Sequence, residues 1–259
     1  MLRLIDVRKS FGSTVAVDGL SLEVHAGEVF GLLGPNGAGK TTTISMAMGL
    51  LRPDSGRVLY AHDAGAASHA HSPADDPRVR AMLGVAPQAL ALYDDLTGEE
   101  NLCFFGRLYG LSGQRLRERV DAVLEGVGLS PRRRDRVRGY SGGMKRRLNL
   151  GAALVHDPPV VLLDEPTAGV DPQSRNNILD LVRSLKGAGK TVVYTTHYME
   201  EAQRLCDRVA IVDRGRLLAL GSVDALVHEH GGRSVVRVRT VEGEERVETD
   251  DPMREAQQQ

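Results

Sequence analysis

The residues best suited to chemistry form a glycine-rich stretch, residues 34–42, directly after a short apolar run. Its pattern, Gly-x-x-x-x-Gly-Lys-Thr, has few Cβ atoms, so backbone N–H groups can wrap around phosphate oxygens while a following helix adds its positive dipole end. Lys40 would then reach the β- and γ-phosphates, and the Thr41 hydroxyl would reach Mg²⁺. A glycine-rich connector is the alternative, but the flanking strand and helix patterns favour a phosphate site.

Two carboxylates and a histidine follow two other apolar runs. Residues 160–163 lead into Asp164 and Glu165, and residues 191–196 lead into His197. Runs without alternation suit central parallel strands, whose carboxyl ends carry ligands in α/β sheets. Asp164 can hold Mg²⁺ through water, while Glu165 can orient and deprotonate an attacking water. A lone histidine after a strand is more often structural, but here the neighbouring polar strand ends favour nucleotide hydrolysis.

A second helix start lies between these groups. The sequence Tyr-Ser-Gly-Gly-Met-Lys, residues 140–145, precedes a helical pattern that runs through Leu154. We place Ser141 as the N-cap, and the two glycines after it leave backbone N–H groups accessible. Taken alone, Ser-Gly-Gly is a weak signal.

The elements that must position these residues alternate between strand and helix patterns, which predicts an α/β protein. We expect strands over 2–7, 15–24, 29–33, 57–60, 79–85, 160–163, 191–196, 209–212 and 216–220. The first two strands form an antiparallel pair that leads into the third. Helices are expected over 43–51, 99–109, 116–127, 173–186 and 223–230, and a hairpin over 234–248 is followed by a frayed glutamine-rich end.

Composition limits what the chain can do. Its 259 residues, 41% of them hydrophobic, fit one large α/β domain with a small appendage. The net charge of -1 provides no general attraction to nucleic acid or anionic lipid. Cys103 and Cys206 lie far apart in a chain without a signal-peptide pattern, which favours reduced core thiols in a cytosolic protein. No apolar run approaches the roughly 20 residues that cross a bilayer.

Three segments leave alternatives open. Residues 61–77, rich in Ala, His, Asp, Ser and Pro, are interpreted as a surface insertion, with a metal site at His69 and His71 as the alternative. Five arginines within residues 131–138 indicate a solvated face, with phosphate or partner contact as the alternative. Four of the ten aromatic residues fall between Tyr93 and Tyr109; core packing is the default interpretation, and a docking surface the alternative.

The chain resembles the ATP-binding cassette (ABC) ATPases over roughly residues 2–221, because the Ser-Gly-Gly sequence lies between the two nucleotide motifs. The resemblance implies a P-loop NTPase of the ABC ATPase type, with a parallel core sheet, an N-terminal antiparallel β subdomain and a helical subdomain at about 89–157. It implies an ABC ATPase domain over 1–222 and a small appendage over 223–259. The sequences at 140–147, 169–172 and 196–202 look most like the ATPase subunits of drug-resistance-type exporters.

The resemblance also implies residue roles. Phe11 resembles the aromatic residue that stacks on adenine, and Gln88 resembles the Q-loop glutamine that senses Mg²⁺ and the attacking water. Asp171 matches the D-loop, and His197 the switch histidine on the γ-phosphate. Asp164 and Glu165 match the Walker B motif. Nucleotide binding is expected at Gly34, Pro35, Asn36, Gly37, Ala38, Gly39, Lys40, Thr41 and Thr42, the Walker A loop.

The catalytic group implied is Glu165, His197, Lys40 and Gln88, and the Mg²⁺ ligands implied are Thr41, Gln88 and Asp164. The signature residues Ser141, Gly142 and Gly143 would serve the nucleotide held by an opposite subunit. Two departures matter: Met144 stands where the family usually has Gln, and Ala168-Gly169-Val170 stands where Ser-Ala-Leu is common. Both leave the catalytic residues in place, so we expect activity while hydrogen bonds at the dimer interface differ.

The resemblance implies an ATPase that uses ATP and Mg²⁺ and pairs with a second copy of itself or a related subunit. A separate integral membrane permease would hold it at the cytoplasmic face of the membrane, with residues 93–109 as the candidate contact. A soluble cassette acting on ribosomes or DNA is the first alternative, but no second cassette or basic footprint occurs, and no nucleic-acid partner is expected. A P-loop GTPase or kinase, the second, leaves the Ser-Gly-Gly sequence unexplained. The transported substrate cannot be read from the sequence.

Overall fold

A computed structural model describes residues 2–60, 72–73, 75–230, 234–240 and 243–249, with side chains described up to residue 229. The chain divides into two units, Met1–Ser222 and Val223–Gln259. No helix among the described residues is both long and apolar enough to span a bilayer.

The first unit is organised around a mixed sheet with the strand order β5-β6-β7-β3-β8-β9. Its strands are β5 (Leu83–Ala86), β6 (Val160–Asp164), β7 (Thr191–Thr196), β3 (Val29–Leu33), β8 (Arg208–Asp213) and β9 (Arg216–Gly221). All neighbouring pairs are parallel except β8 and β9. Strands β3, β6 and β7 are buried along their whole length, which explains why their sequences are apolar without alternation.

One face of this sheet packs against α1 (Lys40–Ala47) and an antiparallel sheet of order β2-β1-β4. This second sheet contains β1 (Leu2–Phe11), β2 (Thr14–Val24) and β4 (Ser55–Tyr60). At the start of β1, alternate residues are buried, first Leu2 and then Leu4. The alternating sequence of this strand therefore reflects one buried face. Phe30 and Leu32 of β3 point into the same core.

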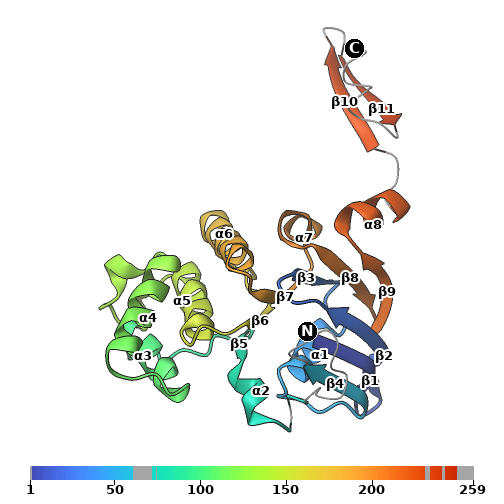
Figure 1. The fold of residues 1–259 in the computed structure, drawn as a ribbon. Coiled ribbons are helices and arrows are strands. Elements are labelled where there is room, and N and C mark those ends of the chain that lie inside the picture. Colours follow the sequence, from blue (N-terminus) through green and yellow to red (C-terminus); the bar gives the residue numbers. More distant parts are fainter. Residues whose placement is uncertain (1, 61–71, 74, 231–233, 241–242, 250–259) are drawn as a thin grey trace. The chain divides into compact units, whose positions relative to one another are not determined.

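The other face packs against helices. Here α5 (Gly142–Leu154), α6 (Pro172–Gly187) and α7 (Met199–Leu205) contact the sheet. Helices α3 (Gly98–Leu108) and α4 (Gly113–Gly126) pack on α5 and form a helical group at the β5 edge of the sheet (Figure 1, green). The core on this side includes Leu102, Leu124, Leu148, Leu163 and Tyr194.

The second unit contains α8 (Val223–His230) and the antiparallel strands β10 (Ser234–Thr240) and β11 (Gly243–Thr249). Val236 pairs with Val247 in their register. The hairpin expected over 234–248 is therefore present. The expected frayed end falls almost entirely outside the described residues.

The expected fold class is confirmed, but three local predictions need correction. Residues 79–85 were expected as a strand, yet Pro77–Ala81 is a short helix, α2, and only Leu83–Ala86 is a strand. The Asp76 side chain accepts a hydrogen bond from the Arg78 N–H and Pro77 occupies the first helical turn, so capping overrides the apolar pattern. The helix expected over 43–51 instead spans Lys40–Ala47.

The third correction concerns the aromatic residues between 93 and 109. Tyr93 is 49% exposed and Tyr109 39% exposed, so core packing was the wrong interpretation for both. The rings of Tyr93 and Phe104 make an edge contact with centroids 4.8 Å apart. The Arg-rich run, in contrast, behaves as a solvated ion-paired face: Arg132 pairs with Asp135, and Arg133 with Glu99 and Asp121.

Candidate active site

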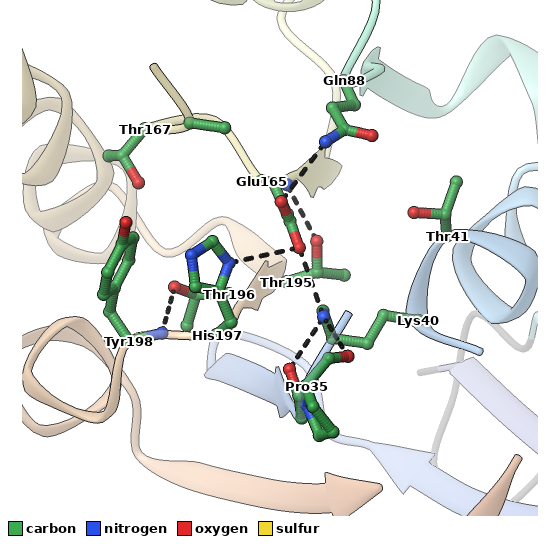
Figure 2. A network of polar contacts seen from close by, with 12 residues as sticks. Pro35, Lys40, Thr41, Gln88, Glu165, Thr167, Thr195, Thr196, His197 and Tyr198 are labelled. Atoms are coloured by element: carbon green, nitrogen blue, oxygen red, sulfur yellow. Dashed lines mark hydrogen bonds and ion pairs between the residues drawn. The ribbon is translucent and has the colours of Figure 1, made fainter. Parts of the chain in front are cut away.

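The glycine-rich loop runs from the end of β3 into α1, and Lys40 is the first residue of that helix. The buried Lys40 ammonium donates hydrogen bonds to the carbonyl oxygens of Gly34 (2.8 Å) and Pro35 (3.0 Å). It also forms an ion pair with Glu165, with 3.2 Å between Nζ and Oε1. Lys40 is thus held inside its own loop and aimed at the Glu165 carboxylate (Figure 2).

Two glycines of the loop are required by their surroundings. Gly39 has a φ of 96° and caps α1 without any side-chain hydrogen bond, which leaves the first N–H groups of the helix for a ligand. A Cβ on Gly39 would also lie 2.3 Å from the carbonyl oxygen of Ala16. At Gly34 a Cβ would lie 2.2 Å from the carbonyl oxygen of Val212. The loop therefore packs too closely for side chains at either position.

The carboxyl ends of β6, β7 and β3 are adjacent, and this adjacency assembles the site. Asp164, the last residue of β6, accepts a hydrogen bond from the hydroxyl of Thr195 on β7 (2.7 Å) and a longer one from Thr41 on α1 (3.4 Å). The Thr195 hydroxyl in turn accepts from the backbone N–H of Glu165 (2.8 Å). Thr195 thus fixes both carboxylate residues.

Glu165 brings together the predicted catalytic group. Besides Lys40, it contacts His197, with 3.5 Å between Nδ1 and Oε1, and accepts a hydrogen bond from the Gln88 amide (3.3 Å). The four side chains expected to act together, Lys40, Gln88, Glu165 and His197, do lie together in Figure 2. A carboxylate held by an amide, an imidazole and an ammonium is well placed to orient a water and accept its proton.

Burial sets the protonation behaviour of the metal-side carboxylate. Asp164 is buried, and desolvation raises its pKa, assisted by the charge of Glu165 and opposed by the hydrogen bonds from Thr195 and Thr41. A cation beside Asp164 would favour the charged form. The oxygen donors of Thr41 and Asp164 lie side by side at the phosphate loop, with the Gln88 amide nearby, and Mg²⁺ prefers such a donor set.

A cavity of about 440 Å³ opens over the loop. Phe11 is 53% exposed and lies at this cavity, so its ring is free to stack on a base. The other lining residues come from β2, the glycine-rich loop and the catalytic group: Thr14, Val15, Ala16, Asn36, Gly37, Gly39, Lys40, Thr41, Thr42, Gln88 and Glu165.

The signature residues lie elsewhere in the chain. Ser141 caps α5, as expected, because its hydroxyl accepts a hydrogen bond from the Met144 N–H (3.2 Å). Ser141, Gly142 and Gly143 are not among the described residues that line the 440 Å³ cavity. Gly143 packs instead against α6, where a Cβ would lie 1.9 Å from the Ser174 hydroxyl.

Asp171, expected in the D-loop, caps α6 and accepts a hydrogen bond from the Ser174 N–H (2.9 Å). That bond lowers the pKa of the Asp171 carboxyl. The structure therefore places Gly143 and Asp171 together, and neither lines the 440 Å³ cavity.

Sequence reasoning missed three supporting residues. Thr195 holds both carboxylates, and its only sequence signal is a hydroxyl inside a buried strand. Arg146 on α5 donates to the carbonyl oxygen of Gln88 (2.6 Å) and so holds the loop that carries Gln88. Glu201 on α7 is buried among four donors near His197. Thr195 and Arg146 have partners that are distant in sequence, as do two of the four contacts of Glu201, and such pairings carry no local signal.

The alternative metal site at His69 and His71 lies outside the described residues. Within the described residues, no group of three or more His, Cys, Asp or Glu side chains could hold a metal ion. Cys103 and Cys206 are both free.

Known proteins resemble this chain in sequence and in fold. The sequence model of the family described as ABC transporter matches residues 17–168. The linearmycin resistance ATP-binding protein LnrL of Bacillus subtilis is 45% identical over 94% of this chain and 76% of its own length. The daunorubicin resistance ATP-binding protein DrrA3 of Streptomyces coeruleorubidus is 48% identical over 86% of this chain and 69% of its own. A Nod factor export ATP-binding protein I from Cupriavidus metallidurans is 45% identical over 92% of this chain and 76% of its own.

Solved structures agree with the fold. An ATP-binding subunit of an ABC transporter superposes with a TM-score of 0.77 at 29% identity and covers 89% of this chain and 93% of its own. A dimeric ATP-binding cassette in a post-hydrolysis state, bound to ADP and Pi, superposes with a TM-score of 0.76 at 25% identity, over 86% of this chain and 99% of its own. The chain belongs to the ABC transporter family, as an ATP-binding and ATP-hydrolysing subunit.

Proposed function

We propose that two such subunits face each other head to tail and that ATP bound between them drives transport through a separate integral membrane permease. The observation that carries this proposal is the separation of two phosphate-seeking helix starts in one chain. The N-terminus of α1 lies with Lys40, Glu165 and His197, whereas the N-terminus of α5, at Ser141, does not line that cavity. A head-to-tail pair lets both helix starts act on one γ-phosphate.

Each residue then has a role in hydrolysis. The loop N–H groups and Lys40 bind the phosphates, and Phe11 stacks on the adenine. Glu165 accepts a proton from the attacking water, Gln88 orients that water, and His197 holds Glu165 and the γ-phosphate in line. Ser141 and Gly143 of the opposite subunit complete the phosphate contacts.

Thr41, Asp164 and Gln88 would hold Mg²⁺, which neutralises charge on the phosphates. Thr41 is hydrogen-bonded to Asp164, and Gln88 is hydrogen-bonded to Glu165. The groups that would hold the ion are therefore fixed relative to Glu165, and so would be the phosphates that they orient.

The names of the relatives support export as the direction of transport. Two relatives are resistance proteins and a third is an export protein. The permease would hold this subunit at the cytoplasmic face of the membrane. The exposed rings of Tyr93 and Tyr109 support residues 93–109 as the surface that meets the permease.

The experiment that tests this proposal replaces Glu165 by Gln. The Gln side chain keeps the shape of Glu165 but cannot accept a proton, so we expect ATP binding to persist while turnover falls by about a thousandfold. Because the nucleotide is then retained, size exclusion in ATP should show a stable dimer that is absent in ADP. Turnover near the wild-type rate would contradict Glu165 as the base, and an ATP-bound monomer would contradict the clamp.

A further inference from the structure

Glu201 is a buried carboxylate that none of the roles above uses. It lies on α7 with only 1% of its surface exposed. Its carboxylate accepts hydrogen bonds from the hydroxyls of Thr167 (2.7 Å), Thr196 (2.6 Å) and Tyr194 (3.0 Å), and it is paired with the Arg175 guanidinium (2.7 Å). A buried carboxylate is tolerated only with such partners, so these four groups are fixed relative to one another.

Two of the partners flank the residues proposed for catalysis. Thr196 directly precedes His197, and its hydroxyl also accepts a hydrogen bond from the Tyr198 N–H (3.0 Å). The backbone on both sides of His197 is therefore tied to Glu201. Thr167 follows Glu165 by two residues, in the loop after β6. Figure 2 shows Thr167, Thr196 and Tyr198 grouped on the His197 side of Glu165.

The third partner connects this cluster to α6. Arg175 lies in the first turn of α6, and its guanidinium also lies over the Tyr198 ring, 4.5 Å from the centroid. Its neighbour Ser174 packs directly against Gly143. The start of α6 thus contacts the signature residues on one side and the His197 loop on the other.

We propose that Glu201 is a positioning residue: it fixes His197 against Glu165 and links it, through Arg175, to the start of α6 and the signature residues. This inference rests on the roles proposed above for His197 and the signature. When the nucleotide held by the opposite subunit displaces Ser141 and Gly143, the start of α6 moves with them. Glu201 then transmits this movement to His197 of the same chain.

The test compares two matched glutamate substitutions. Glu201→Gln removes the charge that holds Arg175 but keeps the side-chain shape. Glu28→Gln is the control, because Glu28 is also buried, pairs with Arg208 at 3.1 Å and accepts a hydrogen bond from the His25 N–H at 2.7 Å, away from His197. We expect Glu201→Gln to lower kcat about tenfold or more with KM for ATP within about twofold, and Glu28→Gln to leave kcat unchanged.

A second background shows whether Glu201 acts through His197. In a His197→Ala chain, studied by single-turnover hydrolysis, Glu201→Gln should cause no further loss, because the residue that it positions is gone. A loss by the same factor as in the wild-type chain would overturn the inference. The ring-proton resonance of His197 should also shift in Glu201→Gln and not in Glu28→Gln, and an unchanged resonance would overturn it as well.

The same series separates this inference from the proposed function. If His197→Ala alone loses hydrolysis, the site stands whatever Glu201→Gln does. If His197→Ala hydrolyses ATP at the wild-type rate, the role of His197 fails, and the role of Glu201 fails with it.

Discussion

Glu165 has a φ of 44°, in the left-handed region that glutamate rarely occupies. Such a conformation costs on the order of 1 kcal/mol and persists where the surroundings over-determine it. Here the Thr195 hydroxyl accepts the Glu165 N–H, and Lys40, Gln88 and His197 hold the carboxylate. These contacts hold the strained backbone of Glu165, and in this conformation its side chain points at the phosphate loop.

Asp164 is predicted to cost stability in the absence of nucleotide. Its raised pKa means that burial favours the protonated form, so its contribution to stability is greatest below the ordinary pKa of 3.8 and is lost as the pH rises through the folded value. Asp164→Asn removes this loss. We expect the variant to have a larger free energy of unfolding than the wild type at pH 7 and no advantage near pH 3, measured by urea titration.

Asp171→Asn provides a control of opposite sign. The pKa of Asp171 is lowered by the Ser174 N–H, so its stabilisation is present above pH 3.8 and is lost as the pH falls. Asp171→Asn should therefore destabilise the chain at pH 7. A destabilised Asp164→Asn at pH 7 would contradict the account of Asp164 as a carboxylate held at a cost.

At this scale, the sequence was sufficient to predict residues that belong to a short motif. Lys40, Asp164, Glu165 and His197 follow apolar runs or glycines that identify them. Thr195 and Glu201 could not be predicted, because their roles depend on partners that only the folded chain brings near: Thr195 meets Asp164 across two strands, and Glu201 meets Thr167 across α7 and the β6 loop.

The helices α1 and α5 begin in different ways, and the difference matches their proposed tasks. Helix α1 is capped by Gly39 without a side-chain hydrogen bond, so its first N–H groups are available to a phosphate in the same chain. Helix α5 is capped by the Ser141 hydroxyl, and the first residue after the cap, Gly142, faces open space. The N-terminus of α1 is therefore suited to a phosphate bound by the same chain, and the N-terminus of α5 to a phosphate bound by the opposite subunit.

Protonation of His156, just after the end of α5, is expected to lower the stability of the folded chain. His156 follows α5 and stacks on Tyr109 with ring centroids 3.5 Å apart. Desolvation lowers the His156 pKa to about 4, and a backbone hydrogen bond with Leu83 opposes this shift only in part. The depressed pKa gives stability that is present above 6.5 and is lost as the pH falls toward 4.

His156→Phe keeps the ring stack but cannot take up a proton. Between pH 6.5 and 4 the wild type should lose roughly 2 kcal/mol more of its free energy of unfolding than the variant does, after allowance for the ring's partial exposure. Urea unfolding at pH 7.5 and pH 4.5 measures this difference. Parallel loss of stability in both proteins would refute His156 as the titrating group.

Element positions followed from the sequence where one signal dominated. The strands β3, β6 and β7 were predicted because they are apolar throughout, and α5 because Ser141 precedes a helical pattern. Residues 79–81 were misassigned because the cap formed by Asp76 and Pro77 competes with the apolar alternation that follows. Core packing was preferred to an exposed surface for residues 93–109, because helical spacing cannot distinguish a core stripe from an exposed one and because Tyr93, which lies before α3, carries no periodic signal at all.

At the scale of the whole molecule, the strand order β5-β6-β7-β3-β8-β9 determines which side chains meet in the candidate site. Because β6, β7 and β3 are neighbours, Asp164, His197 and the phosphate loop emerge at one edge. The sequence predicts β3, β6 and β7 but contains no local record of which strands are neighbours. That order, and the placement of Ser141 apart from the loop, come from tertiary packing.

The central claim is that each hydrolytic site combines Lys40 of one chain with Ser141 of another, and trans-complementation tests it most directly. Lys40→Ala disables the phosphate loop, and Ser141→Arg places a bulky charge on the signature. Each variant alone should be inactive. In a head-to-tail pair, a mixed dimer places both defects in one site and leaves the other intact.

Single-turnover hydrolysis of an equimolar mixture of the two variants is the measurement. The account predicts recovery of about a quarter of the wild-type ADP burst, because half of the dimers are mixed and each has one of two sites intact. A mixture no more active than either variant alone would show that Lys40 and Ser141 serve the same site within one chain, and would contradict the account.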